Sequence, residues 1–180
     1  MSKANKSNKA IKYRLYPNDE QKVMFAKTFG CCRFVYNQLL ALQKQRYKDG
    51  ESHLSKLKSN EFATRTLKKD YDFLKEIDKF AVSNAVFHLA DAYDRFFKKQ
   101  NHFPKFKSKR KSKKSYTTNF TNNNILIGKN VIKLPKVGMV KAVIHKLPKD
   151  DWKLKSVTVS QDGVGNYFAS VLFILKGFEP

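Results

Sequence analysis

The residue types that most often carry catalysis are present in this sequence, but they are scattered along it. The two cysteines, Cys31 and Cys32, are adjacent, which excludes a disulfide framework and a zinc knuckle. We expect both thiols to be buried, as free cysteines usually are. No phosphate-binding loop signature occurs. None of the four histidines has a carboxylate or thiol at the spacing of metal ligands; they are His53, His88, His102 and His145. We therefore expect no catalytic residue, no metal and no cofactor.

Basic side chains offer a different chemistry, the binding of phosphate groups. The net charge is +22 over 180 residues, yet residues 18–97 carry 14 Lys/Arg against 11 Asp/Glu. The other 100 residues carry 23 against 4. Residues 98–114 hold nine basic residues and no acid, with Phe103 and Phe106 among them. Such a run repels itself unless a polyanion neutralises it. A solvated disordered tail is the alternative, but the run lies between two well-patterned segments, which favours nucleic-acid binding.

Composition narrows the class of protein. An apolar content of 41% with 15 Phe and 8 Tyr is typical of a globular chain, and 180 residues can bury one good core or two small ones. No apolar run approaches the length that crosses a bilayer, and residues 1–10 are too polar for a secretory signal. No expected helix has a strongly basic face that would bind a membrane surface. We expect a cytoplasmic, nucleoid-associated protein without a membrane partner.

The first half of the chain has helical patterns. Asn18 can cap a helix, with Gln21 at the capping-box position, and this helix is expected to end at Gly30. Its expected buried residues are Val23, Met24 and Phe29 or their neighbours. A second helix is expected over residues 31–47, where the Asp49-Gly50 pair ends it. The two would form a helical hairpin or helix-turn-helix, a geometry that also occurs in structural bundles. A third helix is expected over residues 55–69 and a fourth from an Asp78 cap to Lys99.

After the basic run the hydrophobic period changes to two. Short strands separated by polar turns are typical of a small barrel, and barrels of the OB type bind nucleic acid. The segment Ile11–Tyr16 is also a strand, but it has no local partner. We expect it to join the barrel, so that the helices between are an insertion. The six expected strands of the second half are residues 116–120, 125–127, 131–134, 139–144, 154–160 and 167–175.

Several strings, in this order along the chain, resemble motifs of the TnpB family, the RNA-guided nucleases encoded by insertion sequences. They are IKYRLYPN at residues 11–18, FVYN at 34–37, DKFA at 78–81, FPKFK at 103–107, FTNNN at 120–124 and KLPKVG at 133–138. Together they span nearly the whole chain.

The resemblance implies an α+β architecture in which an OB-like wedge barrel is interrupted after its first strand by a helical recognition domain. The implied boundaries are residues 1–17 for the first strand, 18–99 for the helical domain, 100–115 for a basic linker and 116–180 for the rest of the barrel. In the family these domains hold a guide RNA scaffold and read a DNA motif beside the transposon, and a RuvC nuclease domain with a zinc ribbon follows. We expect this chain to hold the recognition half without the cutting half, and therefore not to be an enzyme by itself. Its expected partners are structured guide RNA, double-stranded DNA and a separate nuclease chain.

The resemblance also carries over site residues. Those that align with positions approaching the DNA motif are Lys56, Lys79, Phe80, Ser83, Thr121 and Asn122. The basic linker supplies the expected RNA and phosphate contacts, namely Lys105, Lys107, Lys109, Arg110, Lys111, Lys113 and Lys114. Amides and hydroxyls can read base edges while lysines hold phosphates. Core packing for Phe80 and a left-handed turn position for Asn122 are equally good interpretations.

Three other functions remain open at this point. One is a helix-turn-helix DNA-binding regulator that uses residues 18–47 without RNA, although balanced charge on those helices disfavours it. Another is a non-functional remnant of a truncated transposon gene. The last is a structural RNA-binding protein such as a ribosomal component, which the order of the motifs disfavours.

Overall fold

A computed structural model of the chain describes residues 7–175. The chain divides into two compact units. The sheet unit combines Met1–Phe25 with Lys113–Pro180, and the helical unit is Ala26–Ser112. The fold is α+β, as expected from the change of hydrophobic period.

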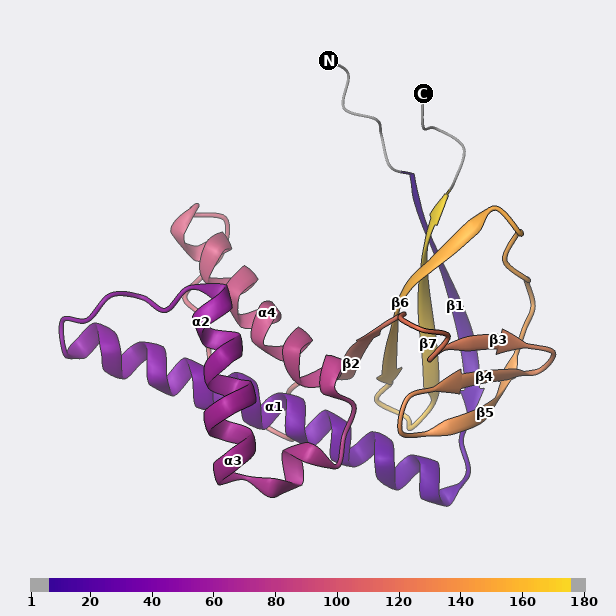
Figure 1. The fold of residues 1–180 in the computed structure, drawn as a ribbon, viewed down its shortest axis with the longest axis horizontal. Coiled ribbons are helices and arrows are strands. Elements are labelled where there is room, and N and C mark those ends of the chain that lie inside the picture. The colour runs from indigo at the N-terminus through magenta and orange to yellow at the C-terminus, as the bar shows by residue number, and fades with distance from the viewer. Residues whose placement is uncertain (1–6, 176–180) are drawn as a thin grey trace, which may run out of the picture. The chain divides into compact units, whose positions relative to one another are not determined.

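The sheet unit is built on one antiparallel sheet of seven strands in the order β2-β6-β7-β1-β5-β4-β3. All six strands expected after the basic run are present within a few residues of their expected bounds. Figure 1 shows β3, β4 and β5 turning away from the direction of β1 and β7, so the sheet is curled. The strands are β1 (Asn8–Tyr16), β2 (Lys114–Asn119), β3 (Leu126–Gly128), β4 (Val131–Leu134), β5 (Gly138–Val143), β6 (Trp152–Gln161) and β7 (Tyr167–Leu175).

The first strand pairs as the sequence predicts, with strands more than 100 residues away. β1 lies between β7 and β5, and Tyr13 faces Ala169 while Leu15 faces both Tyr167 and Ala142. A strand in this position satisfies its backbone groups on both edges. β1 is therefore central to the sheet, and the two edges are β2 and β3.

The core of the sheet unit follows from the alternation of β1. Ile11, Tyr13 and Leu15 are at most 5% exposed, because successive side chains of a strand point to opposite faces and these three share the inner one. Phe25, from the start of the first helix, is fully buried, with its ring centroid 5.6 Å from that of Tyr167. Val23, which was expected in the core, is 57% exposed. The helical period sets Phe25 inward, so the prediction for Val23 was wrong.

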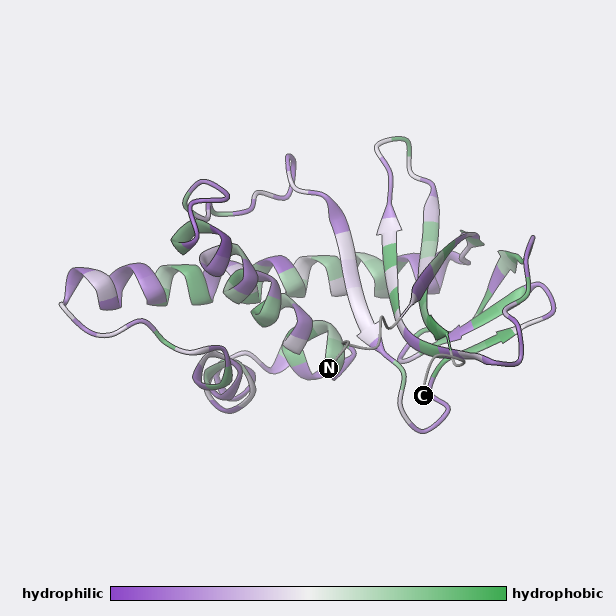
Figure 2. Cartoon of the chain, turned by 90° about the horizontal axis from the view of Figure 1, so that it is seen from above, coloured by the Kyte–Doolittle hydropathy of each residue, from purple (hydrophilic) through white to green (hydrophobic). Residues whose placement is uncertain are grey.

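The expected break at Gly30 is also wrong, because α1 (Asp19–Lys48) is one continuous helix of 30 residues. Its start is the expected capping box, in which the Gln21 amide donates to Asn18 Oδ1 (2.8 Å) and the Asn18 amide donates to Gln21 Oε1 (3.0 Å). It ends at Lys48, two residues before Gly50, whose φ of 72° only glycine adopts easily. Figure 2 shows hydrophobic and hydrophilic bands alternating along α1. Burial continues on both sides of Gly30, at Phe29 and Cys31, and outweighs the low helix propensity of one glycine.

The rest of the helical unit follows the sequence closely. Ser55 caps a helical segment that runs through α2 (Lys56–Glu61), the π-helical η1 (Phe62–Leu67) and α3 (Lys68–Asp70). A short 3-10 turn, η2 (Asp72–Lys75), leads to α4 (Lys79–Phe97). The expected cap is present, since Asp78 Oδ1 accepts from the Phe80 amide at 3.2 Å. Within residues 7–175, no helix is both long and apolar enough to cross a membrane.

Candidate nucleic-acid interface

The first turns of α4 carry three of the residues expected at DNA, namely Lys79, Phe80 and Ser83. Phe80 and Ser83 are both half-buried and lie three positions apart, and Phe87 follows one turn later on the same helix face. The opposite side of α4 is core, with Ala81, Val82, Ala85, Val86, Leu89 and Tyr93 all buried. Phe80 is therefore at the border of the core rather than inside it.

Lysines surround this face of α4. Lys79 Nζ lies 5.2 Å from the ring centroid of Phe80, and Lys56 Nζ, from the start of α2, lies 4.5 Å from that of Phe87. The pKa of Lys68 is lowered, first by burial and then by the neighbouring charge of Lys79. We call the set of Lys56, Lys68, Lys79, Phe80, Ser83 and Phe87 the α4 face. It brings together four of the six residues expected at DNA and adds Lys68 and Phe87, which the sequence did not indicate as DNA contacts.

The other two expected DNA residues belong to the sheet unit, in the turn between β2 and β3. Thr121 and Asn122 are both exposed. Asn122 and Asn123 have φ of 48° and 58°, so the left-handed interpretation of Asn122 is correct. The turn is held by Asn124, whose Oδ1 accepts from the Thr121 amide at 2.8 Å and whose Nδ2 donates to the Asn119 carbonyl at 2.9 Å. The bond at Thr121 uses its backbone amide and not its hydroxyl.

Hydrogen bonds hold the backbone of the basic linker against α1 at Lys107. Asn37 of α1 forms two hydrogen bonds of 2.8 Å with the backbone of Lys107, donating to its carbonyl and accepting from its amide. Lys107 Nζ lies 4.1 Å from the Tyr36 ring centroid, and burial lowers its pKa. Lys107 thus has a packing role that its position in a charge run did not predict.

The other linker cations are exposed, as is the side chain of Lys107 itself. They are Lys105, Lys109, Arg110, Lys111, Lys113 and Lys114. The ion pairs found within residues 7–175 join Lys27 to Glu76, Arg46 to Glu51 and Lys75 to Asp72. None of these involves the linker, so the linker charges have no carboxylate to neutralise them in the described part of the chain. An exposed row of cations of this kind can hold successive phosphates.

A second basic and aromatic surface lies on the outer face of the sheet. Lys12 Nζ is 4.4 Å from the Phe168 ring centroid, and the Arg14 guanidinium is 4.9 Å from that of Tyr16. Arg14 also donates to Asn166 Oδ1 at 2.7 Å. Sequence reasoning used the alternation of β1 to find its buried residues but not its outward ones. The same alternation would have identified them, because Lys12, Arg14 and Tyr16 are the intervening positions.

Three lysines also surround the chain's single tryptophan. The ammonium groups of Lys9, Lys146 and Lys149 lie 4.9, 5.6 and 6.0 Å from the Trp152 ring centroid. The pKa of Lys9 is lowered, chiefly by the adjacent Lys146. No sequence signal links these residues, since they come from β1, the β5–β6 connection and β6.

The two thiols are buried, whereas the side chains of His53 and His88 are partly exposed. Burial raises the pKa of Cys32 to about 12 and also raises that of Cys31, so neither thiol ionises near neutral pH. Burial lowers the pKa of His53 and of His88. Among the described residues, no group of three His, Cys, Asp or Glu side chains could hold a metal ion.

Comparison with known proteins gives matches over most of the chain. A family model of the OrfB type from IS605 elements, described as "Helix-turn-helix domain", matches residues 5–52. In the structure, this region contains β1 and the single helix α1 rather than two helices joined by a turn.

Individual relatives extend the match beyond that region. A "Putative RNA-guided DNA endonuclease" of Streptomyces pristinaespiralis is 31% identical over 166 residues, which cover 91% of this chain and 41% of the relative. The "Putative RNA-guided DNA endonuclease InsQ" of Escherichia coli (strain K12) is 30% identical over 56% of this chain and 25% of its own length. "Virulence protein VsdF" of Salmonella dublin is 32% identical over 56% of this chain and 93% of its own length. The chain thus spans about two fifths of the first relative and a quarter of the second.

Proposed function

Since this chain belongs to the TnpB family, we propose that it is a nucleic-acid-recognition module of an RNA-guided DNA endonuclease. Residues 18–99 form the recognition domain in this proposal, residues 100–115 the linker, and residues 1–17 with 116–180 an OB-like wedge. Structured guide RNA is the first partner. The observation that carries the proposal is the exposed linker, whose cations have no carboxylate partner among the described residues and follow the nearly balanced residues 18–97.

Binding of the guide RNA uses the linker as a row of phosphate contacts. The exposed linker cations have flexible side chains. They can contact phosphates along a folded RNA without distinguishing its base sequence. Asn37 fixes the path of the linker backbone at Lys107, which reduces the ordering needed on binding. Lys12 and Arg14 on the sheet add cations that lie over aromatic rings.

Binding of duplex DNA beside the transposon uses the α4 face of the helical unit, and the β2–β3 turn of the sheet unit is proposed as a separate DNA contact. Lys56 and Lys79 would hold phosphates, while the Ser83 hydroxyl and the Asn122 amide would reach base edges. The geometric support is the row of Phe80, Ser83 and Phe87 on one side of α4 with a lysine at each end.

Strand cleavage is not part of the proposed role of these 180 residues. Metal-assisted cleavage of a phosphodiester needs carboxylates that converge on one or two metal ions. The proposal therefore includes a nuclease domain or chain as a partner that supplies such a site.

A matched pair of variants tests the RNA proposal. The first changes four linker cations to Gln, namely Lys109, Arg110, Lys111 and Lys113. The second changes four exposed cations elsewhere to Gln, namely Lys22, Lys58, Arg65 and Lys69, and so removes the same amount of charge. We expect the linker variant to bind structured RNA more weakly and with a shallower salt dependence. The slope of log K against log[salt] should fall by about 0.7–0.9 for each phosphate that the protein no longer neutralises. Equal effects of the two variants in a fluorescence anisotropy titration would contradict the proposal.

The name of the matching family model favours a second candidate, a DNA-binding protein that needs no RNA. The same titration separates the two functions. Under the first proposal, the linker variant binds structured RNA more weakly but duplex DNA as tightly as the wild type, because the DNA lies on the α4 face. A DNA-only protein instead binds duplex DNA more tightly than structured RNA at the same salt concentration, and no RNA-specific loss appears in the linker variant.

A further inference from the structure

The helical unit contains an aromatic groove that the proposed function does not use. It has a volume of about 880 Å³ and lies among the C-terminal halves of α1 and α4, the loop after α1, and the start of the linker. The rings that line it include His53, Tyr93, Phe96, Phe97, Phe103 and Phe106. Phe97 is 58% exposed, Phe103 41% and Phe106 52%. Apolar rings of this size are normally buried, so a cluster of exposed ones indicates a binding surface.

The rings are held in fixed orientations by one another. Phe103 stands edge-on to both Phe96 and Tyr93, with centroid separations of 5.1 and 5.5 Å and interplanar angles of 84° and 87°. His53 stands edge-on to Phe97 at 5.5 Å. Edge-to-face packing stabilises the cluster while leaving ring faces open to a flat ligand.

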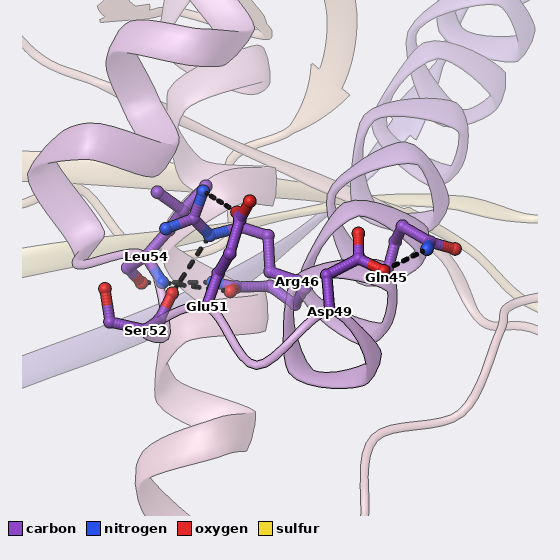
Figure 3. Close-up of polar contacts among 7 residues, drawn as sticks. Gln45, Arg46, Asp49, Glu51, Ser52 and Leu54 are labelled. Atoms are coloured by element: carbon purple, nitrogen blue, oxygen red, sulfur yellow. Dashed lines mark hydrogen bonds and ion pairs between the residues drawn. The ribbon is translucent and has the colours of Figure 1, made fainter.

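The loop that carries His53 is also held in place. Figure 3 shows Arg46 reaching both Ser52 and Glu51, and its Nε donates to the Ser52 carbonyl at 2.9 Å. The Leu54 amide donates to Gln43 Oε1 at 3.0 Å, and Gln43 Nε2 donates to the Leu54 carbonyl at 3.0 Å. Arg46 pairs with Glu51 at 2.8 Å, so the carboxylate that lines the groove is already neutralised.

The charge around the groove is positive. Lys44 Nζ lies 4.5 Å from the Phe106 ring centroid and 5.6 Å from that of Phe103, and Lys48 also lines the groove. Phe103 and Phe106 alternate along the chain with Lys105 and Lys107, so the groove is continuous with the basic linker. Flat apolar surfaces beside cations match the two parts of a nucleotide, its base and its phosphate.

We propose that this aromatic groove stacks unpaired bases of a single-stranded RNA segment on Phe97, Phe103 and Phe106, while Lys44 and Lys48 hold the adjoining phosphates. The inference rests on the proposed RNA binding and deepens it, since it assigns paired regions of the RNA to the linker and an unpaired segment to the groove. Stacking does not depend on which base is present, so the groove selects for unpaired structure rather than for sequence.

The test compares two RNA probes with the full chain. One is an octamer of adenosine with a central 2-aminopurine, and the other is a blunt RNA duplex without unpaired bases. The variants are Phe97→Leu and Phe106→Leu, which keep an apolar side chain but remove the ring. Phe73→Leu is the control, because Phe73 is 43% exposed in the same unit but does not line the groove.

We expect the wild-type protein and Phe73→Leu to bind the octamer equally and to change the 2-aminopurine fluorescence. Each groove variant should bind the octamer about tenfold more weakly, within the range for removal of one stacked base, with no change for the duplex. Unchanged octamer binding by both groove variants, or equal losses for octamer and duplex, would overturn the inference. Wild-type binding of the duplex but not of the octamer would overturn it while leaving the proposed function intact. No RNA binding at all would overturn both. Concentration-dependent dimerisation that Phe106→Leu abolishes, with RNA binding unchanged, would overturn it by showing that a second copy of the chain occupies the groove.

Discussion

Replacing Leu15 by alanine should remove a large fraction of the free energy of unfolding of the sheet unit. Leu15 is 1% exposed on β1, and its partners in the sheet, Tyr167 and Ala142, are themselves buried at 8% and 6% exposure. Because β1 lies between β7 and β5, neighbouring strands cannot close over the cavity without losing their own pairing. Leu→Ala in such a core costs about 2–5 kcal/mol. The free energy of unfolding of a domain is typically only about 5–15 kcal/mol.

The single tryptophan makes this change measurable in one unit alone. Trp152 lies in β6 with its ring 5.6 Å from that of Phe173, so its fluorescence reports unfolding of the sheet unit. In urea titrations, the expected loss corresponds to a midpoint lower by about 1–2 M. The matched control is Leu147→Ala, since Leu147 is 64% exposed in the same unit and its replacement should cost less than about 0.5 kcal/mol.

The reasoning fails if the two leucine variants unfold at the same urea concentration. That result would mean that β1 is not a central strand and that the pairing of residues 8–16 with β7 and β5 is wrong. It would also contradict the architecture in which the helices are inserted between two parts of one sheet.

Three further predictions concern the helical unit. Gly30→Ala should stabilise α1 by about 0.5–1 kcal/mol, because a Cβ at Gly30 meets no atom closer than 3.8 Å. The midpoint of thermal unfolding followed by helical circular dichroism should therefore rise. A lower midpoint would indicate a turn at this residue. Cys32 should react with Ellman's reagent at pH 8 only after unfolding, since burial raises its pKa to about 12; fast labelling of the folded protein would contradict this burial. Burial lowers the pKa of His53 and His88 below 6.5, so the unfolded chain takes up protons more readily than the folded one. The free energy of unfolding followed by helical circular dichroism should therefore be constant above about pH 7 and fall as the pH drops below 6.5, and a double His→Gln variant should lose this fall; a wild type without it would refute the assignment.

Much of the local structure could be predicted from the sequence. The capping box at Asn18, the cap at Asp78 and the turn at Gly50 were all recognisable, because each depends on residues close together along the chain. The strands were also recognisable, because their alternation records which side chains face a core. The continuity of α1 was not, since a glycine ends some helices and is tolerated in others according to what the flanking residues bury.

The candidate interface divides in the same way. The linker charges were evident from composition, and the family strings indicated Lys79, Phe80 and Ser83. The position of Lys56 over Phe87 and the bond between Asn37 and Lys107 were not evident, because they join segments about 30 and 70 residues apart. Only the packing of α2 against α4, and of the linker against α1, sets those distances.

The sequence by itself determined the class of fold, the insertion of helices after a first strand, the family and the presence of a strongly basic segment. Only the tertiary structure decided which cations have aromatic or backbone partners, that β1 is a central strand, and that exposed rings from separate segments form one groove. The reason is physical. Helix caps, turns and hydrophobic periodicity depend on residues close together along the chain, so the order of those residues predicts them. Contacts between distant segments depend instead on how the whole chain closes its loops and fills its cores, and no local pattern specifies that.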